Sequence, residues 1–146
     1  MPLSASQLNA ADAYNLIRGT AVGVKQMAQT YVNQLQGGNV DPTFVFRVLD
    51  QTHSFISQMQ SWQGISGLDA YATNQGYSGS MSADIGTCIT AAQAMTAWVV
   101  NNFPTAGGYL QAESLNTDGS RTLRQFTPAQ TAGWVTAINA FIATIN

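Results

Sequence analysis

The chain has 146 residues, of which 8% are charged, where an ordinary soluble domain has about 25%. The 5 Lys and Arg and 7 Asp and Glu residues leave a net charge of −2, which creates no field that would attract nucleic acid or an anionic membrane. Uncharged polar residues replace the missing charges: 14 Gln, 10 Asn, 15 Thr and 11 Ser. Because interface cores are depleted in Lys, Glu and Asp, we predict a subunit that works packed against other copies or other proteins.

Length and composition predict one domain over residues 1–146, large enough to bury a core because 45% of the residues are hydrophobic. The single cysteine, Cys88, excludes an internal disulfide. The first residues contain no basic region followed by an apolar run, so we expect no signal peptide. The sequence contains no window of 18 uninterrupted apolar residues, so we expect no membrane-spanning helix.

The first predicted helix covers residues 4–35, where apolar residues recur in steps of three and four. Gly37 and Gly38 are expected to end it, because glycine accepts a left-handed cap without steric cost. Gly19 and Gly23 lie inside this helix, one turn apart, and each costs about 1 kcal/mol relative to alanine. They indicate either a flat patch where another helix comes close, or a tolerated weakness or kink.

Two further helices follow. Asp41 as N-cap and Pro42 in the first turn predict a helix with an apolar stripe down to Trp62, closed by Gly64. A glycine-containing stretch over 65–80 has room for one or two helical turns around residues 68–72. Ser80 or Ser82 then caps a helix that ends before Pro104, because a residue before proline avoids the helical region.

The periodicity changes after Pro104. Residues 109–116 and 121–126 flank a turn with Asp118 and Gly119, which predicts a β-hairpin over about 109–126. An isolated hairpin is marginal in water, so it must lie on the helices or join a sheet in a neighbouring subunit. Thr127 and Gln130 match a capping box for the last helix. The predicted fold is mainly α: a four-helix bundle-like domain with one hairpin before the C-terminal helix.

The sequence contains little that suggests chemistry. His53 is the only histidine; it follows Asp50 by three residues, but a metal site needs more ligands and no second His or Cys exists. Nothing near Cys88 would lower its pKa, so we read it as a buried, inert thiol. No carboxylate pair for acid–base work and no phosphate-binding glycine loop appear. We therefore expect no enzyme activity, no cofactor, no metal and no small-molecule substrate.

The expected function is contact with other proteins, including further copies of the chain. The basic residues are too dispersed for a nucleic-acid footprint. Arg121 or Arg124 is either a partner for a carboxylate on a neighbouring subunit or an ordinary solvated charge. Tyr109 and Phe126, on the hairpin, are candidate interface anchors. The predicted interface residues are thus Tyr109, Arg121, Arg124, Phe126, Gly19 and Gly23.

Residues 118–133 carry a resemblance: a hairpin tip, an Arg-containing strand, and Phe-Thr-Pro-Ala-Gln-Thr-Ala leading into the last helix. This pattern resembles the tail of small uncharacterised structural proteins in the virions of tailed bacteriophages. The resemblance implies a structural part of a virion, in the neck, the tail or associated with the capsid. It implies other virion proteins as partners and assembly in the host cytoplasm, and it brings no catalytic residues.

A second resemblance rests on Trp62-Gln63-Gly64, between two predicted helices. It is similar to the turn of WXG-type secreted helical hairpins, which are about two helices long, whereas this chain has additional helices. The alternative function is therefore a secreted helical effector or export substrate. A third possibility is a small ligand-binding protein or enzyme that uses His53.

Overall fold

A computed structural model describes residues 4–106, 109–110 and 112–145, without the side chains of Ser6 and of residues 105–111. It is mainly helical, with an antiparallel hairpin before the last helix, as predicted. The helices are α1 (Ala5–Gly37), α2 (Pro42–Gln63), α3 (Leu68–Asn74), α4 (Met81–Asn102) and α5 (Pro128–Ala143). The strands are β1 (Thr105–Ala106), β2 (Tyr109–Leu110), β3 (Glu113–Leu115) and β4 (Arg121–Leu123).

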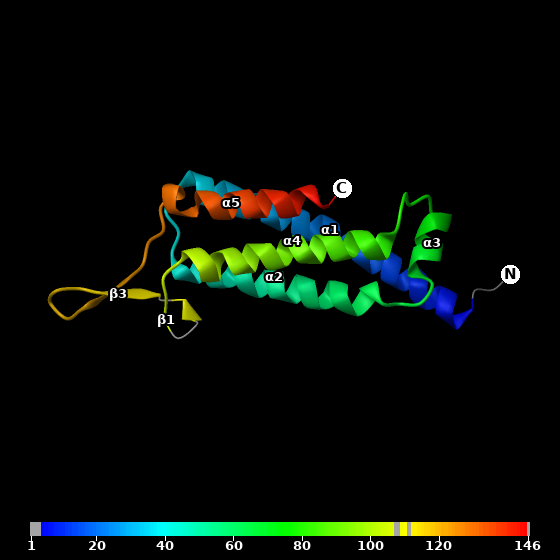
Figure 1. Ribbon diagram of the computed structural model, residues 1–146, viewed down its shortest axis with the longest axis horizontal. Helices are drawn as coiled ribbons and strands as arrows, with labels where there is room; N and C mark the ends of the chain where they lie inside the picture. The colour runs from blue at the N-terminus through cyan, green and yellow to red at the C-terminus, as the bar shows by residue number, and fades with distance from the viewer. Residues whose placement is uncertain (1–3, 107–108, 111, 146) are drawn as a thin grey trace.

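The four long helices run up and down beside one another, each antiparallel to the long helix before it (Figure 1). Each packs mainly against two of the others, in the cyclic order α1, α2, α4, α5. The short helix α3 crosses α1 at the end of the bundle opposite the strands (Figure 1). This is the up-and-down bundle that short connections between amphipathic helices favour, with α3 inserted between α2 and α4.

Local capping explains where the helices begin. Asp41 accepts from the backbone N–H of Phe44, Ser80 from Ala83, and Thr127 from Gln130, so each cap side chain gives a partner to one of the unpaired donors of its first turn. The predicted capping box of Thr127 and Gln130 is confirmed. The prediction for the end of α1 is right in position but wrong in reason. Gly38 has a φ of 170°, which is extended backbone and not a left-handed cap.

The core is richest in aromatic rings at the end of the bundle that carries the strands. Trp134 is completely buried, and its indole N–H donates to the carbonyl of Met95 over 3.0 Å. Trp98 stacks parallel to Trp134, and Phe103 meets both rings edge to face. Gly133 has to be glycine here, because an added Cβ would lie 2.7 Å from Nε1 of Trp98.

The strands form two separate sheets, which corrects the single predicted hairpin. β1 pairs with β2, and β3 pairs with β4, so residues 109–116 are not one strand. The turn between β3 and β4 has Gly119 at φ 86°, and the Asp118 carboxylate accepts from the backbone N–H and the hydroxyl of Ser120. The expected hairpin is thus shorter than predicted, and the β1–β2 hairpin precedes it.

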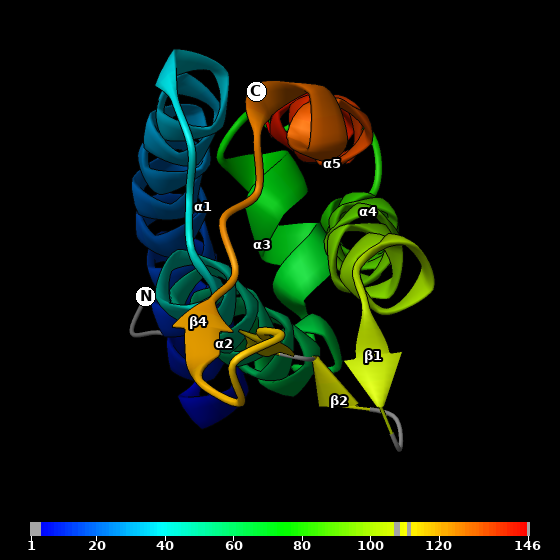
Figure 2. The same ribbon diagram turned by 90° about the vertical axis from the view of Figure 1, so that its left-hand side faces the viewer.

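A pair of backbone hydrogen bonds joins the exit of the second hairpin to the α1–α2 connection. Val40 donates to the carbonyl of Phe126 over 3.0 Å, and Phe126 donates to that of Val40 over 2.7 Å. The end-on view shows these two segments, cyan and orange, running side by side across the bundle end (Figure 2). The chain is therefore fixed to the bundle immediately after the hairpin.

Candidate assembly interface

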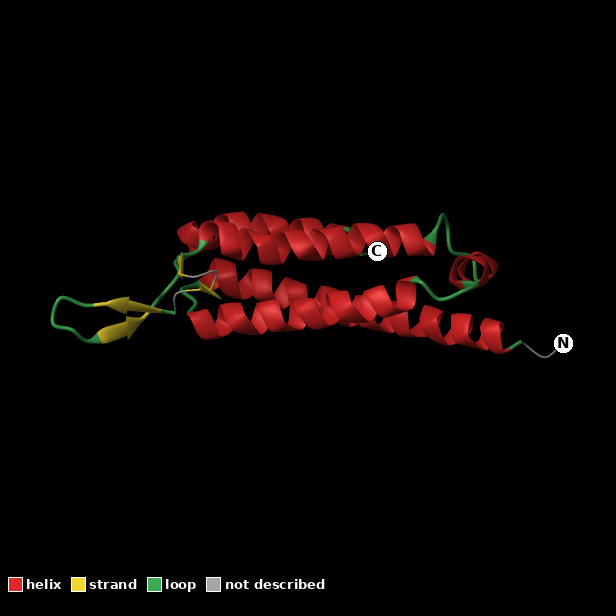
Figure 3. Ribbon diagram, turned by 60° about the horizontal axis from the view of Figure 1, so that its bottom comes forward, coloured by secondary structure: helices red, strands yellow, loops and turns green. Residues whose placement is uncertain are grey.

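The β3–β4 hairpin projects beyond the end of the bundle (Figures 1 and 3). All three β4 residues are exposed, as are Glu113 and Leu115 of β3. Because only Ser114 among the six strand residues is even half-buried, these residues contribute almost nothing to the core. The projecting hairpin is therefore open to contact with another molecule.

One face of this hairpin is polar and satisfies its own hydrogen bonds. Ser114 lies opposite Thr122, and the Asn116 amide donates to the Thr122 hydroxyl over 2.7 Å and to that of Ser120 over 3.0 Å. These contacts hold the two strands together without help from the helices. They explain how the hairpin keeps its shape away from the bundle.

The other face carries two leucines and two opposite charges. Pairing places Glu113 opposite Leu123 and Leu115 opposite Arg121, and side chains directly opposite, or two apart on a strand, share a face. Leu115 is 70% exposed and Leu123 is 41% exposed. We call Glu113, Leu115, Arg121 and Leu123 the leucine face.

Phe126 is not an exposed anchor, and that prediction is wrong. It is 4% exposed and stacks on Phe103, with ring centroids 4.3 Å apart. The aromatic side chain instead fixes the root of the hairpin to the bundle core. The backbone of Tyr109 belongs to β2, apart from β3 and β4, and its side chain lies outside the described residues.

Arg121 and Arg124 lie in different surroundings. Arg121 is exposed on the leucine face, whereas Arg124 is half-buried at the root of the hairpin, where its backbone N–H donates to the carbonyl of Ala112. Arg124 lines an open hollow of about 550 Å³ between the hairpin, the end of α4 and the start of α5. Of the predicted residues, only Arg121 belongs to the leucine face, so the structure does not bring the predicted set together.

Gly19 and Gly23 lie on an exposed face of α1. Within the described part of the chain, an added Cβ at either position meets no atom within 4 Å. Helical spacing places Leu16 and Val22 near the same face, and both are about half exposed. No described helix of this chain packs on the two glycines, so a partner helix there would have to come from another molecule.

The residues considered for catalysis or metal binding do not form one site. His53 and Asp50 are both exposed on α2. Cys88 is buried, and burial raises the pKa of its thiol, although a hydrogen bond with Thr144 opposes the change. Over residues 4–106, 109–110 and 112–145, no group of three or more His, Cys, Asp and Glu side chains is placed to hold a metal ion.

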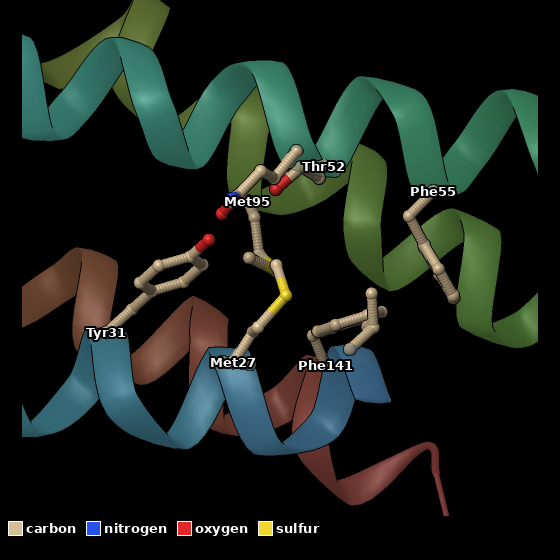
Figure 4. A pocket seen from close by; sticks show the side chains of 9 residues that line it. Met27, Tyr31, Thr52, Phe55, Met95 and Phe141 are labelled. Carbon is tan, nitrogen blue, oxygen red and sulfur yellow. The ribbon is translucent and has the colours of Figure 1, made fainter. Parts of the chain in front are cut away.

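Two spaces between the helices are too small for an ordinary small-molecule ligand. A cavity of about 10 Å³ lies among Met27, Tyr31, Thr52, Met95 and Phe141 (Figure 4) and has room for one water at most. Burial raises the pKa of the Tyr31 phenol there, and the charge of Arg47 partly offsets the effect. A groove of about 170 Å³ runs between α1 and α4 past the end of α5. Ordinary small-molecule sites measure about 300–1,000 Å³, so both spaces are small for such a role.

Sequence reasoning missed the polar contacts that join α3 to α4. The Asp69 carboxylate accepts from the backbone N–H of Ser82 over 2.7 Å and from its hydroxyl over 2.6 Å. Tyr77 donates its phenolic proton to Asp84. Asp69 and Ser82 are 13 residues apart, and Tyr77 and Asp84 are 7 apart. No sequence motif predicted either contact.

Trp62 and Gln63 form the end of α2, and Gly64 caps it. The Gln63 amide donates to the carbonyl of Ser82 over 2.9 Å, so this segment also contacts the start of α4. The helix after Gly64 is α3, and the long antiparallel partner α4 comes only after it. The segment therefore differs from a direct two-helix turn.

None of the helices, over the residues that the structure describes, is both long and apolar enough to cross a membrane. No known family model, curated protein or solved structure matches the chain.

Proposed function

We propose that this protein is a non-enzymatic structural subunit of a phage virion, in the neck, the tail or associated with the capsid, and that it acts by protein–protein assembly. The observation that carries the proposal is the projecting hairpin with Leu115 and Leu123 facing outward. Exposed apolar side chains on a strand pair that contributes little to its own core are typical of a contact surface.

The low charge of the whole chain supports the same proposal. A free monomer of this size usually keeps more charge to remain soluble, and only 12 residues are charged here. The virion itself is proposed from the resemblance of residues 118–133 to small virion proteins. Those residues form the hairpin turn, β4, the Phe126 root and the first turn of α5, which together set how the hairpin leaves the bundle.

The test is the composition of purified particles. In a host that carries the gene, particles are isolated on a density gradient and analysed by mass spectrometry. We expect the wild-type chain in the particles, and strongly reduced incorporation of Leu115→Ser/Leu123→Ser. The matched control is Phe46→Ser/Val100→Ser, which alters two similarly exposed apolar residues on α2 and α4. Absence of the wild-type chain from the particles would exclude a virion role.

The alternative, a secreted WXG-type effector, receives less support because α3 separates Trp62 and Gly64 from the long antiparallel helix. Export of the chain by a secretion system, with loss of export in Trp62→Ala, would favour that alternative over the virion. Gene neighbourhood separates the two functions as well: portal, capsid and tail genes on one side, and a secretion locus on the other.

A further inference from the structure

The leucine face has an internal symmetry that goes beyond simple exposure. Its four side chains occupy the corners of a rectangle, two on β3 and two on β4, about 6.8 Å long along the strands and about 5 Å wide across them. Leu115 and Leu123 lie at the ends of one diagonal, and Glu113 and Arg121 lie at the ends of the other. Diagonal neighbours in an antiparallel pair are about 7–8 Å apart, and no ion pair joins Glu113 to Arg121 across this diagonal within the described hairpin.

We propose that the leucine face docks on the leucine face of a second copy of this chain, about a two-fold axis parallel to the Leu115–Leu123 diagonal. This inference rests on the proposed assembly role and names the partner of the same surface. A two-fold contact requires a patch that is complementary to itself, and this patch meets that requirement through its opposite charges.

The geometry follows from the register. Rotation about that axis places each leucine against its own equivalent in the other copy. The same rotation places Glu113 against Arg121 of the second copy, and Arg121 against its Glu113, so both charges gain a partner. A two-fold axis along the strands, or a two-fold axis across the strands, would instead place Glu113 against a leucine of the second copy. The strands of the two hairpins then cross at about 70°, twice the angle between the strands and the diagonal, which is closer to the orthogonal than to the aligned way in which sheets pack face to face.

The charges decide between a second copy and an unrelated apolar partner. An apolar partner would have to cover Glu113 and Arg121 without pairing them, which carries a desolvation penalty. Within residues 4–106, 109–110 and 112–145, neither side chain has a hydrogen bond or ion pair. A second copy pairs both charges in the same step that buries the leucines.

The contact is small, and this determines how it works. Four side chains on each copy cover much less than the roughly 1,200–2,000 Å² of a stable interface. A single pair of hairpins therefore associates weakly in solution. In an assembly with many copies, the effective concentration is high, and the weak contact sets the arrangement of neighbours.

Sedimentation velocity of the full chain, up to about 1 mM, tests the proposal. We expect a concentration-dependent dimer for the wild type, and dimer dissociation constants raised at least about tenfold by Leu115→Ser/Leu123→Ser, Glu113→Arg and Arg121→Glu. Thr117→Arg, at the turn and outside the leucine face, is the matched charge control and keeps wild-type association. Circular dichroism confirms that every variant is folded.

The most discriminating experiment mixes the two charge variants. A Glu113→Arg chain and an Arg121→Glu chain repel their own kind but complement each other at both charge positions. An equimolar mixture therefore associates about as well as the wild type, and so does the double variant Glu113→Arg/Arg121→Glu.

Three results would overturn the inference. They are a wild type that stays monomeric throughout, a leucine double variant that dimerises as the wild type does, and a mixture that associates no better than its components. Each leaves the virion role open, because particle composition tests that role separately. A chain found in particles with none of these dimer properties is incorporated through a contact other than the one proposed here.

Discussion

The bundle and the β3–β4 hairpin use apolar side chains in opposite ways. In the bundle, Trp134 is fully buried, and its stripe of neighbours faces inward. In the hairpin, Leu115 and Leu123 face outward, and the polar side closes on itself through Asn116. The buried apolar residues of the bundle fold the chain, whereas the two leucines of the hairpin remain available for contact with another molecule.

This difference makes folding and assembly separable by mutation. The root of the hairpin is fixed by Phe126, which belongs to the core, while the strands beyond it add little burial. Substitutions in the strands should change association without changing stability. Substitutions in the bundle should do the reverse, as long as the protein still folds.

The largest expected contrast is between Trp134→Ala and Leu115→Ala. Removing Trp134 leaves a cavity and deprives the Met95 carbonyl of its donor, so the free energy of unfolding should fall by about 3–5 kcal/mol. Leu115→Ala should change it by less than about 0.5 kcal/mol. Urea unfolding followed by circular dichroism measures both, and similar losses for the two variants would contradict the division between bundle and hairpin.

Two glycine substitutions inside helices test packing at a smaller scale. Gly133→Ala puts a Cβ against the Trp98 ring, and this overpacking should lower the free energy of unfolding by about 1–3 kcal/mol. Gly23→Ala, where the described chain leaves open space, should raise it by about 1 kcal/mol. The urea midpoints should move in opposite directions. If Gly23→Ala also impairs particle incorporation, the exposed face of α1 is a second contact surface.

Asp69 in the bundle and Asp118 in the hairpin each accept hydrogen bonds from a serine, so substituting them compares the two regions. Hydrogen bonds from Ser82 hold the pKa of Asp69 below 3.8, and those from Ser120 do the same for Asp118. A lowered native pKa means that the stabilisation is present above about pH 4 and is lost as the pH falls through the native value. Asp69→Ala, which frees α3 from α4, should reduce the free energy of unfolding by about 1 kcal/mol at neutral pH. Asp118→Ala alters an exposed turn outside the bundle, and its urea midpoint should fall less than that of Asp69→Ala.

The smallest effect is expected at alkaline pH. Burial and the hydrogen bond to Asp84 raise the pKa of Tyr77 from 10.0 to about 12. The unfolded chain then loses this proton before the native state does, so the stabilisation is complete below about pH 10 and declines between pH 10 and 12. Tyr77→Phe should unfold with a shallower dependence on pH in that window. Parallel curves for wild type and variant would mean that this hydrogen bond is not linked to stability.

Sequence patterns predicted the features that depend on neighbouring residues. The Asp41 and Thr127 caps each use a donor three residues away, and helical periodicity identified the long helices. The turn at Gly119 was predicted for the same reason. The position of Phe126 was not, because its ring partner Phe103 and its backbone partner Val40 are distant in the sequence. An aromatic residue on an expected strand can either be exposed and contact a partner, or be buried and fix the hairpin to the core.

The amino-acid sequence by itself determined a low-charge helical chain with a hairpin before its last helix, because caps, turns and apolar periods act over a few residues. Only the tertiary structure decided which side chains of that hairpin face outward and which join the core. That choice depends on strand register and on contacts between distant segments. Turn chemistry can favour a hairpin register, but short-range patterns do not specify the contacts between distant segments.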